Sequence, residues 1–248
     1  MTKCKKNELL IVSINVSGLK RKLFDLQFIN YLKKFDIIFL QETWCEGDQF
    51  YSIKGYQCWF KNKVKMKSLG RGIGGICTYV RNHITAKILQ IDDIEETLWV
   101  NVQTGQLNIN ICNVYRQPDE SEYSNINFFE QIEKQLENVR EIDPTCEFLI
   151  AGDWNARIGQ KIEEDLFDRF QFISTDLEEL VKIDYSERKS QDKTINRSGR
   201  QLLKFTAQSG LMILNGRSRG DESGEFTFIS NAGSSVVDYM LASPKIFE

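Results

Sequence analysis

The chain has 248 residues, of which 41% are hydrophobic and 27% charged, and its formal net charge is -3. This composition is typical of a globular protein with a sizeable core, and it excludes a largely disordered chain. Because the overall charge is slightly negative, any binding of nucleic acid must come from a local basic surface.

The six cysteines are scattered without a CxxC pair, and His83 is the only histidine available to complete a zinc site. We therefore expect reduced, mostly buried thiols. The apolar run near the amino terminus is too short for a secretory signal, and no segment has the length and apolarity of a membrane span. These features predict an intracellular protein, in the nucleus and the cytoplasm, without a membrane partner.

Apolar runs, several of them alternating, predict strands along most of the chain. In chain order they occupy residues 9–14, 37–40, 55–60, 73–80, 84–91, 98–102, 107–114, 148–151, 211–214, 226–228 and 235–241. Apolar residues at helical spacing predict helices over residues 24–35 and 129–139. A capping box at residues 198–201 predicts the start of a third helix, which Gly210 should end. Strands and amphipathic helices in this order indicate an α/β fold.

Four of the predicted strands end on side chains that can carry chemistry. These side chains belong to Asn15, Glu42, Tyr115, and the pair Asp153 and Asn155. A carboxylate and an amide at the end of a buried strand could take a proton from water and hydrogen-bond a phosphoryl oxygen. Each residue alone could equally serve a turn or a sheet end, because Asp and Asn are favoured in turns for local reasons. Their repetition at four strand ends predicts that the ends converge on one site.

Five motifs, SINVSGL, LQETW, NVY, GDWNARIG and SVVDYMLAS, occur in this order and resemble those of the endonuclease/exonuclease/phosphatase family. Within that family the chain is most similar to the apurinic-type endonucleases of non-LTR retrotransposons, over nearly its whole length. The resemblance implies a four-layer DNase I-like sandwich, with two packed mixed β-sheets flanked by helices, in a single domain over residues 1–248. The family's Ser-Asp-His motif is absent, so we expect a C-terminally truncated domain.

The resemblance also implies a role for each residue at the strand ends. Glu42, assisted by Asn15, would hold Mg²⁺, with Mn²⁺ as an alternative ion. Asp153 would orient and deprotonate the attacking water. Asn155 and Tyr115 would bind the phosphate, where fixed donors stabilise the developing charge.

Two residues near the carboxyl end carry further expectations. Asp238 stands in an otherwise apolar predicted strand, where a carboxylate is costly unless a partner satisfies it. In the family that the chain resembles, this aspartate orients a histidine of the Ser-Asp-His motif, which is missing here. Thr227 is a weaker candidate for lining the site.

The most basic part of the chain is a loop between two predicted strands. It contains Lys61, Lys63, Lys65, Lys67 and Arg71. Such a patch could contact the backbone of DNA in a salt-dependent way, or it could simply be a solvated loop.

These features together predict a Mg²⁺-dependent phosphodiesterase that nicks DNA and derives from a retrotransposon, whose longer parent protein could include a reverse transcriptase domain. Two alternatives stay open. The same fold could act as a phosphatase on a small phosphate ester, because one fold hosts many substrates. The chain could also be a catalytically incomplete remnant that binds nucleic acid or a protein without cleaving it.

Overall fold

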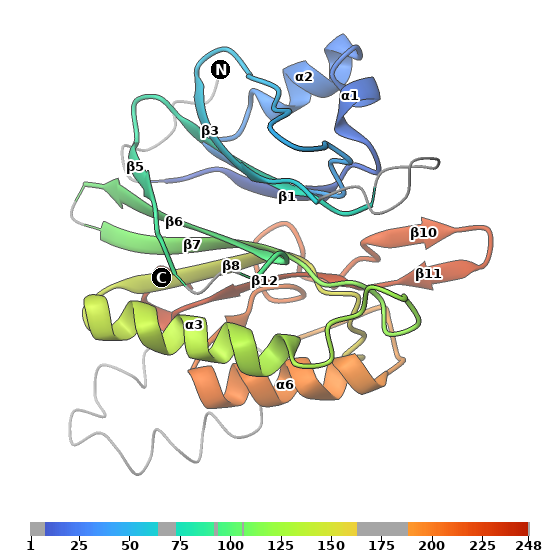
Figure 1. Ribbon diagram of the computed structural model, residues 1–248. Coiled ribbons are helices and arrows are strands. Elements are labelled where there is room, and N and C mark those ends of the chain that lie inside the picture. Colours follow the sequence, from blue (N-terminus) through green and yellow to red (C-terminus); the bar gives the residue numbers. More distant parts are fainter. Residues whose placement is uncertain (1–7, 64–72, 92–93, 106, 163–187, 248) are drawn as a thin grey trace. The chain divides into compact units, whose positions relative to one another are not determined.

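The computed structural model describes residues 8–63, 73–91, 94–105, 107–162 and 188–247, and it divides into two compact units. Unit 1 comprises Met1–Gln117 and Ile150–Asp153, and unit 2 comprises Pro118–Leu149 and Trp154–Glu248. Both units contain strands and helices, as the ribbon in Figure 1 shows.

The first sheet lies in unit 1 and has four strands in the order β1-β2-β4-β3. Its strands are β1 (Ile11–Asn15), β2 (Ile37–Gln41), β3 (Tyr56–Lys61) and β4 (Ile76–Arg81). The pair β1 and β2 is parallel, whereas β4 is antiparallel to both of its neighbours, so the sheet is mixed. The parallel register sets Asn15 beside Gln41. The carboxyl ends of β1 and β2 therefore meet at one edge of this sheet.

A helix predicted over residues 24–35 is present as α2 (Leu26–Leu32), which is shorter than expected, and the short helix α1 (Leu19–Lys22) precedes it without having been predicted. The predicted start at Phe24 was wrong because Asp25 is the N-cap: its carboxylate accepts hydrogen bonds from the backbone N–H groups of Gln27 and Phe28. As a result Phe24, which the periodicity placed on the packing face, is 82% exposed. Leu32 still packs into the core of the first sheet.

The second sheet has six strands in the order β5-β6-β7-β8-β12-β9. These are β5 (Thr85–Ile88), β6 (Thr97–Thr104), β7 (Leu107–Tyr115), β8 (Glu147–Asp153), β9 (Met212–Ile213) and β12 (Asp238–Ala242). Strands β5, β6 and β7 form an antiparallel meander. The buried strand predicted before Asp153 is confirmed as β8, and only its last four residues belong to unit 1.

Gly152 lies inside β8. A Cβ atom at this position would sit 1.9 Å from the carbonyl oxygen of Val114 on β7. Glycine is therefore needed here because the backbones of β7 and β8 approach closely, and not because the chain turns.

Within unit 1 the two sheets pack face to face around a buried polar network. The Gln41 amide donates to Asn113 Oδ1 at 2.7 Å and to Ser13 Oγ at 3.0 Å. Asn113 in turn donates to the backbone carbonyls of Cys77, at 2.9 Å, and Leu40, at 3.2 Å. Since β7 carries Asn113 and the first sheet carries the other four residues, the network fixes which residues of the two sheets face one another.

In unit 2 the helices α3 (Phe128–Ile142) and α6 (Arg197–Ser209) pack together through aromatic side chains. The rings of Phe128, Phe129 and Phe205 all lie within 6.3 Å of the fully buried indole of Trp154, measured between ring centroids. The predicted apolar face of α3 is confirmed, because its apolar residues at helical spacing are buried. This cluster holds the segment that follows Asp153.

The ends of α6 confirm one expectation and correct another. Gly210 ends the helix in the left-handed conformation, with φ of 69°. The N-cap is Asn196 and not Ser198: its side-chain oxygen accepts from the N–H of Gly199 at 2.7 Å. Ser198 instead donates its hydroxyl proton to Asp119. The capping box predicted at residues 198–201 was therefore placed two residues too late.

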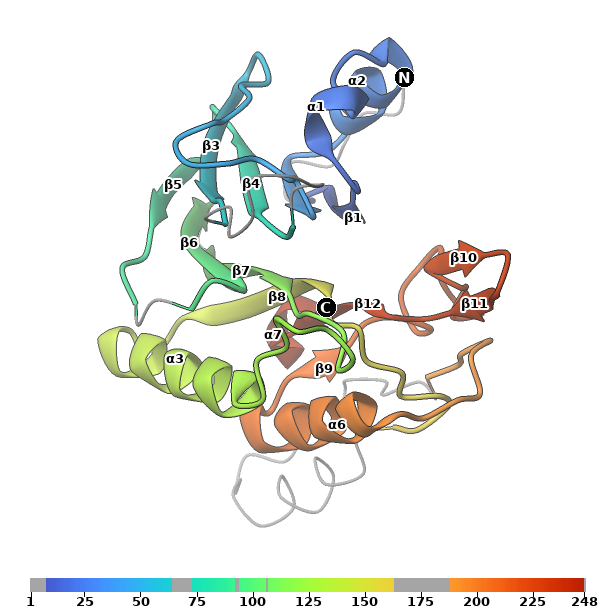
Figure 2. The same cartoon turned by 45° about the vertical axis from the view of Figure 1, so that its right-hand side comes forward.

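The last part of unit 2 contains the hairpin of β10 (Phe228–Ser230) and β11 (Gly233–Ser235), and the short helix α7 (Pro244–Phe247). Figure 2 shows this hairpin extending from the body of unit 2. The strand predicted over residues 235–241 is divided, because β11 ends at Ser235 and β12 begins at Asp238. No helix in the part of the chain that the structure describes is long and apolar enough to cross a membrane. Two mixed sheets flanked by helices, the predicted fold class, are confirmed.

Candidate active site

Hydrogen bonds in unit 1 join four of the predicted strand-end residues into two pairs. Asn15, at the end of β1, donates from Nδ2 to Asp153 Oδ2, at the end of β8, over 2.9 Å. Tyr115, at the end of β7, donates its hydroxyl proton to Oε1 of Glu42, directly after β2. The parallel register of β1 and β2 places Asn15 and Glu42 at the same sheet edge. Unit 1 thus presents two carboxylates, an amide and a phenol at its strand ends.

Glu42 is held in an unusual backbone conformation. Its φ is 51° and that of Trp44 is 54°, both in the left-handed region that non-glycine residues rarely adopt. Such a conformation costs roughly 1–3 kcal/mol per residue and persists only where surrounding contacts enforce it, which is common at functional sites. Here the Glu42 carbonyl accepts from the N–H of Gly18 at 2.8 Å, and the N–H of Thr43 donates to Gly75 at 3.1 Å.

The side chain of Glu42 is also fixed. The indole N–H of Trp44 donates to Oε2 at 3.2 Å, while Tyr115 donates to Oε1. The Trp44 ring lies against Gly18, where a Cβ atom would come within 2.6 Å of it. Trp44 stands within the motif LQETW, but the sequence indicates no role for it, because the left-handed turn that brings its indole back to Glu42 has no signature in the sequence.

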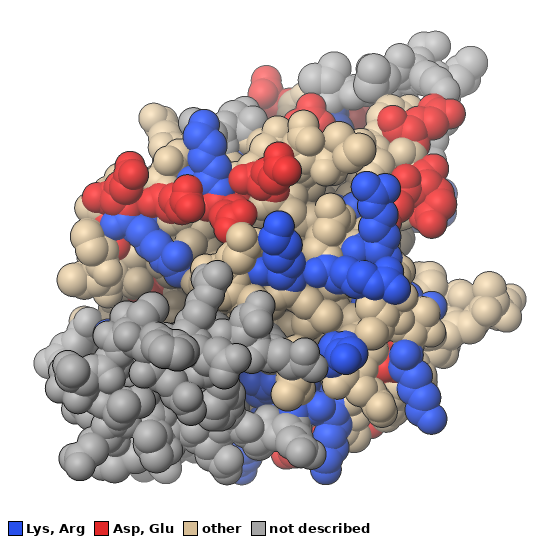
Figure 3. Space-filling model, turned by 90° about the horizontal axis from the view of Figure 1, so that it is seen from below, with Lys and Arg blue, Asp and Glu red and all other residues tan. Residues whose placement is uncertain are grey.

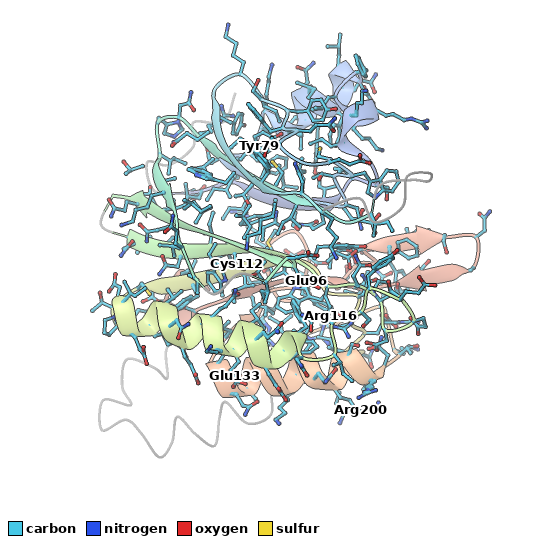
Figure 4. The ribbon with its side chains drawn as sticks, in the orientation of Figure 1. Tyr79, Glu96, Cys112, Arg116, Glu133 and Arg200 are labelled. Atoms are coloured by element: carbon cyan, nitrogen blue, oxygen red, sulfur yellow. The ribbon has the colours of Figure 1, made fainter. Side chains whose placement is uncertain are left out.

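The amide of Asn15 has a defined orientation. Its Oδ1 accepts from the backbone N–H of Ser17 at 3.1 Å and from the Ser17 hydroxyl at 3.2 Å, which leaves Nδ2 to donate to Asp153. Asp153 is buried, and its backbone carbonyl accepts from the N–H of the buried Arg116 at 2.9 Å. Arg116 is labelled in Figure 4. The plane of the Asp153 carboxylate is therefore constrained by a neutral donor.

A hard divalent cation fits Glu42 better than Asn15. Each carboxylate oxygen of Glu42 has a hydrogen bond from Tyr115 or Trp44, and an oxygen of this kind has capacity for a further interaction. Asn15 Oδ1 already accepts twice from Ser17, so it could reach an ion only by giving up one of these bonds. Among the described residues no three His, Cys, Asp or Glu side chains gather as a metal cluster. A site with one carboxylate would leave most of the coordination of a divalent ion to water.

The remaining predicted residues lie in unit 2. Asn155 has φ of 45°, again left-handed, and its carbonyl accepts from Asn196 Nδ2 at 3.5 Å. Thr227 Oγ1 accepts from the N–H groups of Val237 and Asp238, at 3.1 and 3.2 Å. Asp238 therefore begins β12 and does not interrupt a longer strand, as the sequence had suggested. Thr227 fixes the backbone at this strand start.

The structure describes only the first residues of the basic loop, up to Lys63. Lys61 donates to the carbonyl of Ile94 at 3.1 Å, and Lys63 forms an ion pair with Glu95 at 3.2 Å while its side chain is 16% exposed. Lys65, Lys67 and Arg71 lie outside the described residues. Contact of this loop with DNA stays a prediction.

On the face shown in Figure 3, basic side chains gather near the middle, and further basic side chains lie among the acidic ones. In unit 2 the exposed residues of α6 include Arg197, Arg200 and Lys204, and those of α3 include Glu130 and Glu137. A net charge of -3 thus coexists with local basic surface.

Solved structures share this fold. The endonuclease domain of TRAS1, a telomere-specific non-LTR retrotransposon, matches with a TM-score of 0.59 and 16% identity, over 95% of this chain and 85% of that chain. The AP endonuclease LMAP from Leishmania major matches with a TM-score of 0.66 and 16% identity, over 95% of this chain and 79% of that chain. The fold is that of nucleases and phosphoesterases.

The sequence pattern of the endonuclease/exonuclease/phosphatase family matches residues 12–247, and the chain belongs to this family. A relative described as a probable RNA-directed DNA polymerase from transposon BS, of Drosophila melanogaster, is 25% identical over 156 residues. The match covers 61% of this chain and 16% of that protein, so the chain spans a small part of the relative's length.

Proposed function

We propose that the protein hydrolyses a phosphodiester of DNA with the help of Mg²⁺ or Mn²⁺ and leaves a nick. The observation that carries this proposal is the fixed carboxylate of Glu42, strained in its backbone and held by Tyr115 and Trp44. Nucleases of this family generally use divalent metal ions. When bound, the ion would neutralise charge on the phosphoryl oxygens.

Each residue of the candidate site has its own role in the proposed reaction. Glu42 would hold the ion. Asp153, oriented by Asn15, positions the attacking water and takes its proton. Asn155 and Tyr115 bind the phosphate. Because Tyr115 donates to Glu42 in the structure, its hydroxyl proton must change partner when phosphate arrives.

The role of Thr227 follows from its contacts. Its hydroxyl oxygen accepts from two backbone N–H groups, so we assign it to holding Asp238 in place and not to touching the substrate. Asp238 itself is proposed to orient a basic partner, as its counterpart does in the family.

DNA is the proposed partner, and a reverse transcriptase domain is the proposed neighbour in a longer parent protein. The support is the similarity to a probable RNA-directed DNA polymerase from a transposon, together with the shared fold of a retrotransposon endonuclease domain. In such a protein the nick would supply the primer for reverse transcription.

The test is relaxation of supercoiled plasmid with Mg²⁺ and with EDTA. Asp153→Asn should slow nicking by ~10²–10⁴-fold, the usual contribution of a positioned base. Asp48→Asn, at an exposed position of unit 1, is the matched control and should nick at the normal rate. Nicking that survives EDTA or Asp153→Asn contradicts the mechanism. Hydrolysis of small phosphate esters alone would favour the phosphatase, and binding of DNA without cleavage would favour the remnant.

A further inference from the structure

Two thiols meet on neighbouring strands of the first sheet. The antiparallel register pairs Cys58 of β3 with Tyr79 of β4, and Phe60 with Cys77, so Cys58 and Cys77 are diagonal neighbours on one face. Their Sγ atoms are 3.2 Å apart. A disulfide bond is about 2.05 Å long, so an approach of about 1.2 Å would join them.

The two cysteines differ in freedom of movement. Cys77 lies in β4, between β2 and β3, where it is buried, pairs with Leu40 and has its carbonyl bound by Asn113. Cys58 lies in β3, at the edge of the same sheet, and is only partly buried. Cys58 can therefore both meet a small reagent and close the gap to Cys77.

The surroundings also favour Cys58 as the attacking sulfur. The hydrogen bond with Cys77 lowers the pKa of Cys58 and, with a smaller contribution from Tyr79, outweighs the effect of its burial. Burial raises the pKa of Cys77 well above the ordinary value of a thiol. Tyr79 is labelled in Figure 4. Because the thiolate is the nucleophile in exchange reactions, Cys58 reacts first.

We propose that Cys58 and Cys77 form a reversible dithiol–disulfide site that reacts with small disulfides such as oxidised glutathione. The Cys58 thiolate attacks the small disulfide, forms a mixed disulfide and releases one small thiol. Cys77 then loses its proton to solvent, its sulfur attacks Cys58 Sγ, and the second small thiol leaves. Two protein thiols are oxidised and one small disulfide is reduced to two thiols.

A disulfide between Cys58 and Cys77 would close a loop that contains the basic stretch of the chain. Residues 59–76 lie between the two cysteines and include the whole basic stretch from Lys61 to Arg71. The other described cysteines of unit 1 are engaged elsewhere: Cys45 Sγ donates to the Thr43 carbonyl and Cys112 Sγ donates to the Asn113 carbonyl. We therefore expect a disulfide between Cys58 and Cys77 and no other pairing among the described cysteines of unit 1.

Peptide mapping tests this pairing directly. The chain is equilibrated with reduced and oxidised glutathione, its remaining thiols are alkylated, and it is digested with trypsin. Cleavage after Lys and Arg places Cys58 in residues 55–61 and Cys77 in residues 72–81, whereas the other described cysteines fall in residues 35–54, 88–116 and 141–157. We expect a cross-linked species of the first two peptides that grows with oxidised glutathione and disappears with dithiothreitol.

Two variants and one stability measurement complete the test. Cys58→Ser should abolish the cross-link, while Cys146→Ser, a matched change in unit 2, should leave it intact. Oxidation should raise the urea midpoint of the native chain and leave that of Cys58→Ser unchanged, because the bond restricts the unfolded chain. The proposal is overturned if both peptides stay alkylated in oxidised glutathione, if Cys58 stops at the mixed disulfide, or if Cys45 forms the cross-link instead.

Discussion

Asp192 offers a sharp test of what holds unit 2 together. Its carboxylate accepts from Arg157 Nε at 2.8 Å and from Arg157 Nη2 at 2.7 Å. It also accepts from the backbone N–H groups of Thr194, at 2.9 Å, and Val236, at 3.1 Å. The side chain of Asp192 is 2% exposed and that of Arg157 is 32% exposed. One buried carboxylate thus joins three segments that are distant in sequence.

Asp192→Asn should lower the free energy of unfolding by ~2–4 kcal/mol. Hydrogen bonds to charged groups contribute ~1.5–3 kcal/mol each, and the two bonds from Arg157 are discounted because this arginine is partly exposed. The loss is a large share of the ~5–15 kcal/mol that stabilises a typical domain. With a urea slope of ~2 kcal/mol/M, in the middle of the usual range, the midpoint should fall by ~1–2 M. Tryptophan fluorescence can follow the transition, because Trp154 is buried in the same unit.

The same variant has an expected pH dependence. Burial raises the pKa of Asp192, but the hydrogen bonds from Arg157, Thr194 and Val236 outweigh it and hold the pKa below its usual value. A carboxyl group with a depressed folded-state pKa stabilises the fold above its unfolded pKa, and this stabilisation is lost as the pH falls through the folded-state pKa. The difference between native chain and variant should therefore be full at neutral pH and shrink below about pH 4. A midpoint shift under ~0.3 M, or a difference that persists unchanged at pH 3, would refute this reasoning.

Three further predictions concern the candidate site and its support. Glu42→Gln should weaken binding of Mg²⁺ and Mn²⁺ in calorimetric titration because the anionic ligand is lost, and unchanged binding would remove Glu42 from the site. Gly152→Ala should destabilise the fold by ~1–3 kcal/mol or more, because the new methyl group would meet the Val114 carbonyl at 1.9 Å; a normal urea midpoint would show that β7 and β8 can separate at no cost. Replacing the loop lysines by glutamine should flatten the dependence of DNA affinity on salt, and an unaltered slope would return the loop to a solvated role. The lysines to change are Lys61, Lys63, Lys65 and Lys67.

Much of the sheet could be predicted from the sequence, because strands that are buried on both faces leave solid apolar runs. The run before Asp153 became β8, and the alternating run before Tyr115 became β7. Polar residues at the strand ends stand out against these runs, so the sequence alone can indicate Asn15, Glu42, Tyr115 and Asp153 as candidate site residues. The pairing of Asn15 with Asp153 depends on strand order, which periodicity does not encode.

The errors in the prediction occurred where a cap or a long-range contact decides the local structure. The helical spacing begins at Phe24, yet the Asp25 side chain caps the helix and leaves Phe24 outside it and exposed. Asn196 caps α6 because its side chain also binds the N–H of Arg157, a contact 39 residues away in sequence. The role of Trp44 depends on the left-handed backbone conformations of Glu42 and Trp44. These conformations cost energy locally, and contacts with Gly18 and Gly74 stabilise them.

The division of β8 has a consequence for synthesis on the ribosome. Unit 1 is not a contiguous stretch, since its last four residues, Ile150–Asp153, are translated well after Gln117. At ~5–20 residues per second, the amino-terminal part of unit 1 waits roughly 2–7 s before β8 is made, and longer before that strand leaves the exit tunnel. During this interval Asn15 lacks the Asp153 carboxylate and the end of β7 lacks its neighbour in the sheet. The nascent chain therefore emerges with an open sheet edge, the kind of surface that chaperones shield and that invites pairing with other chains.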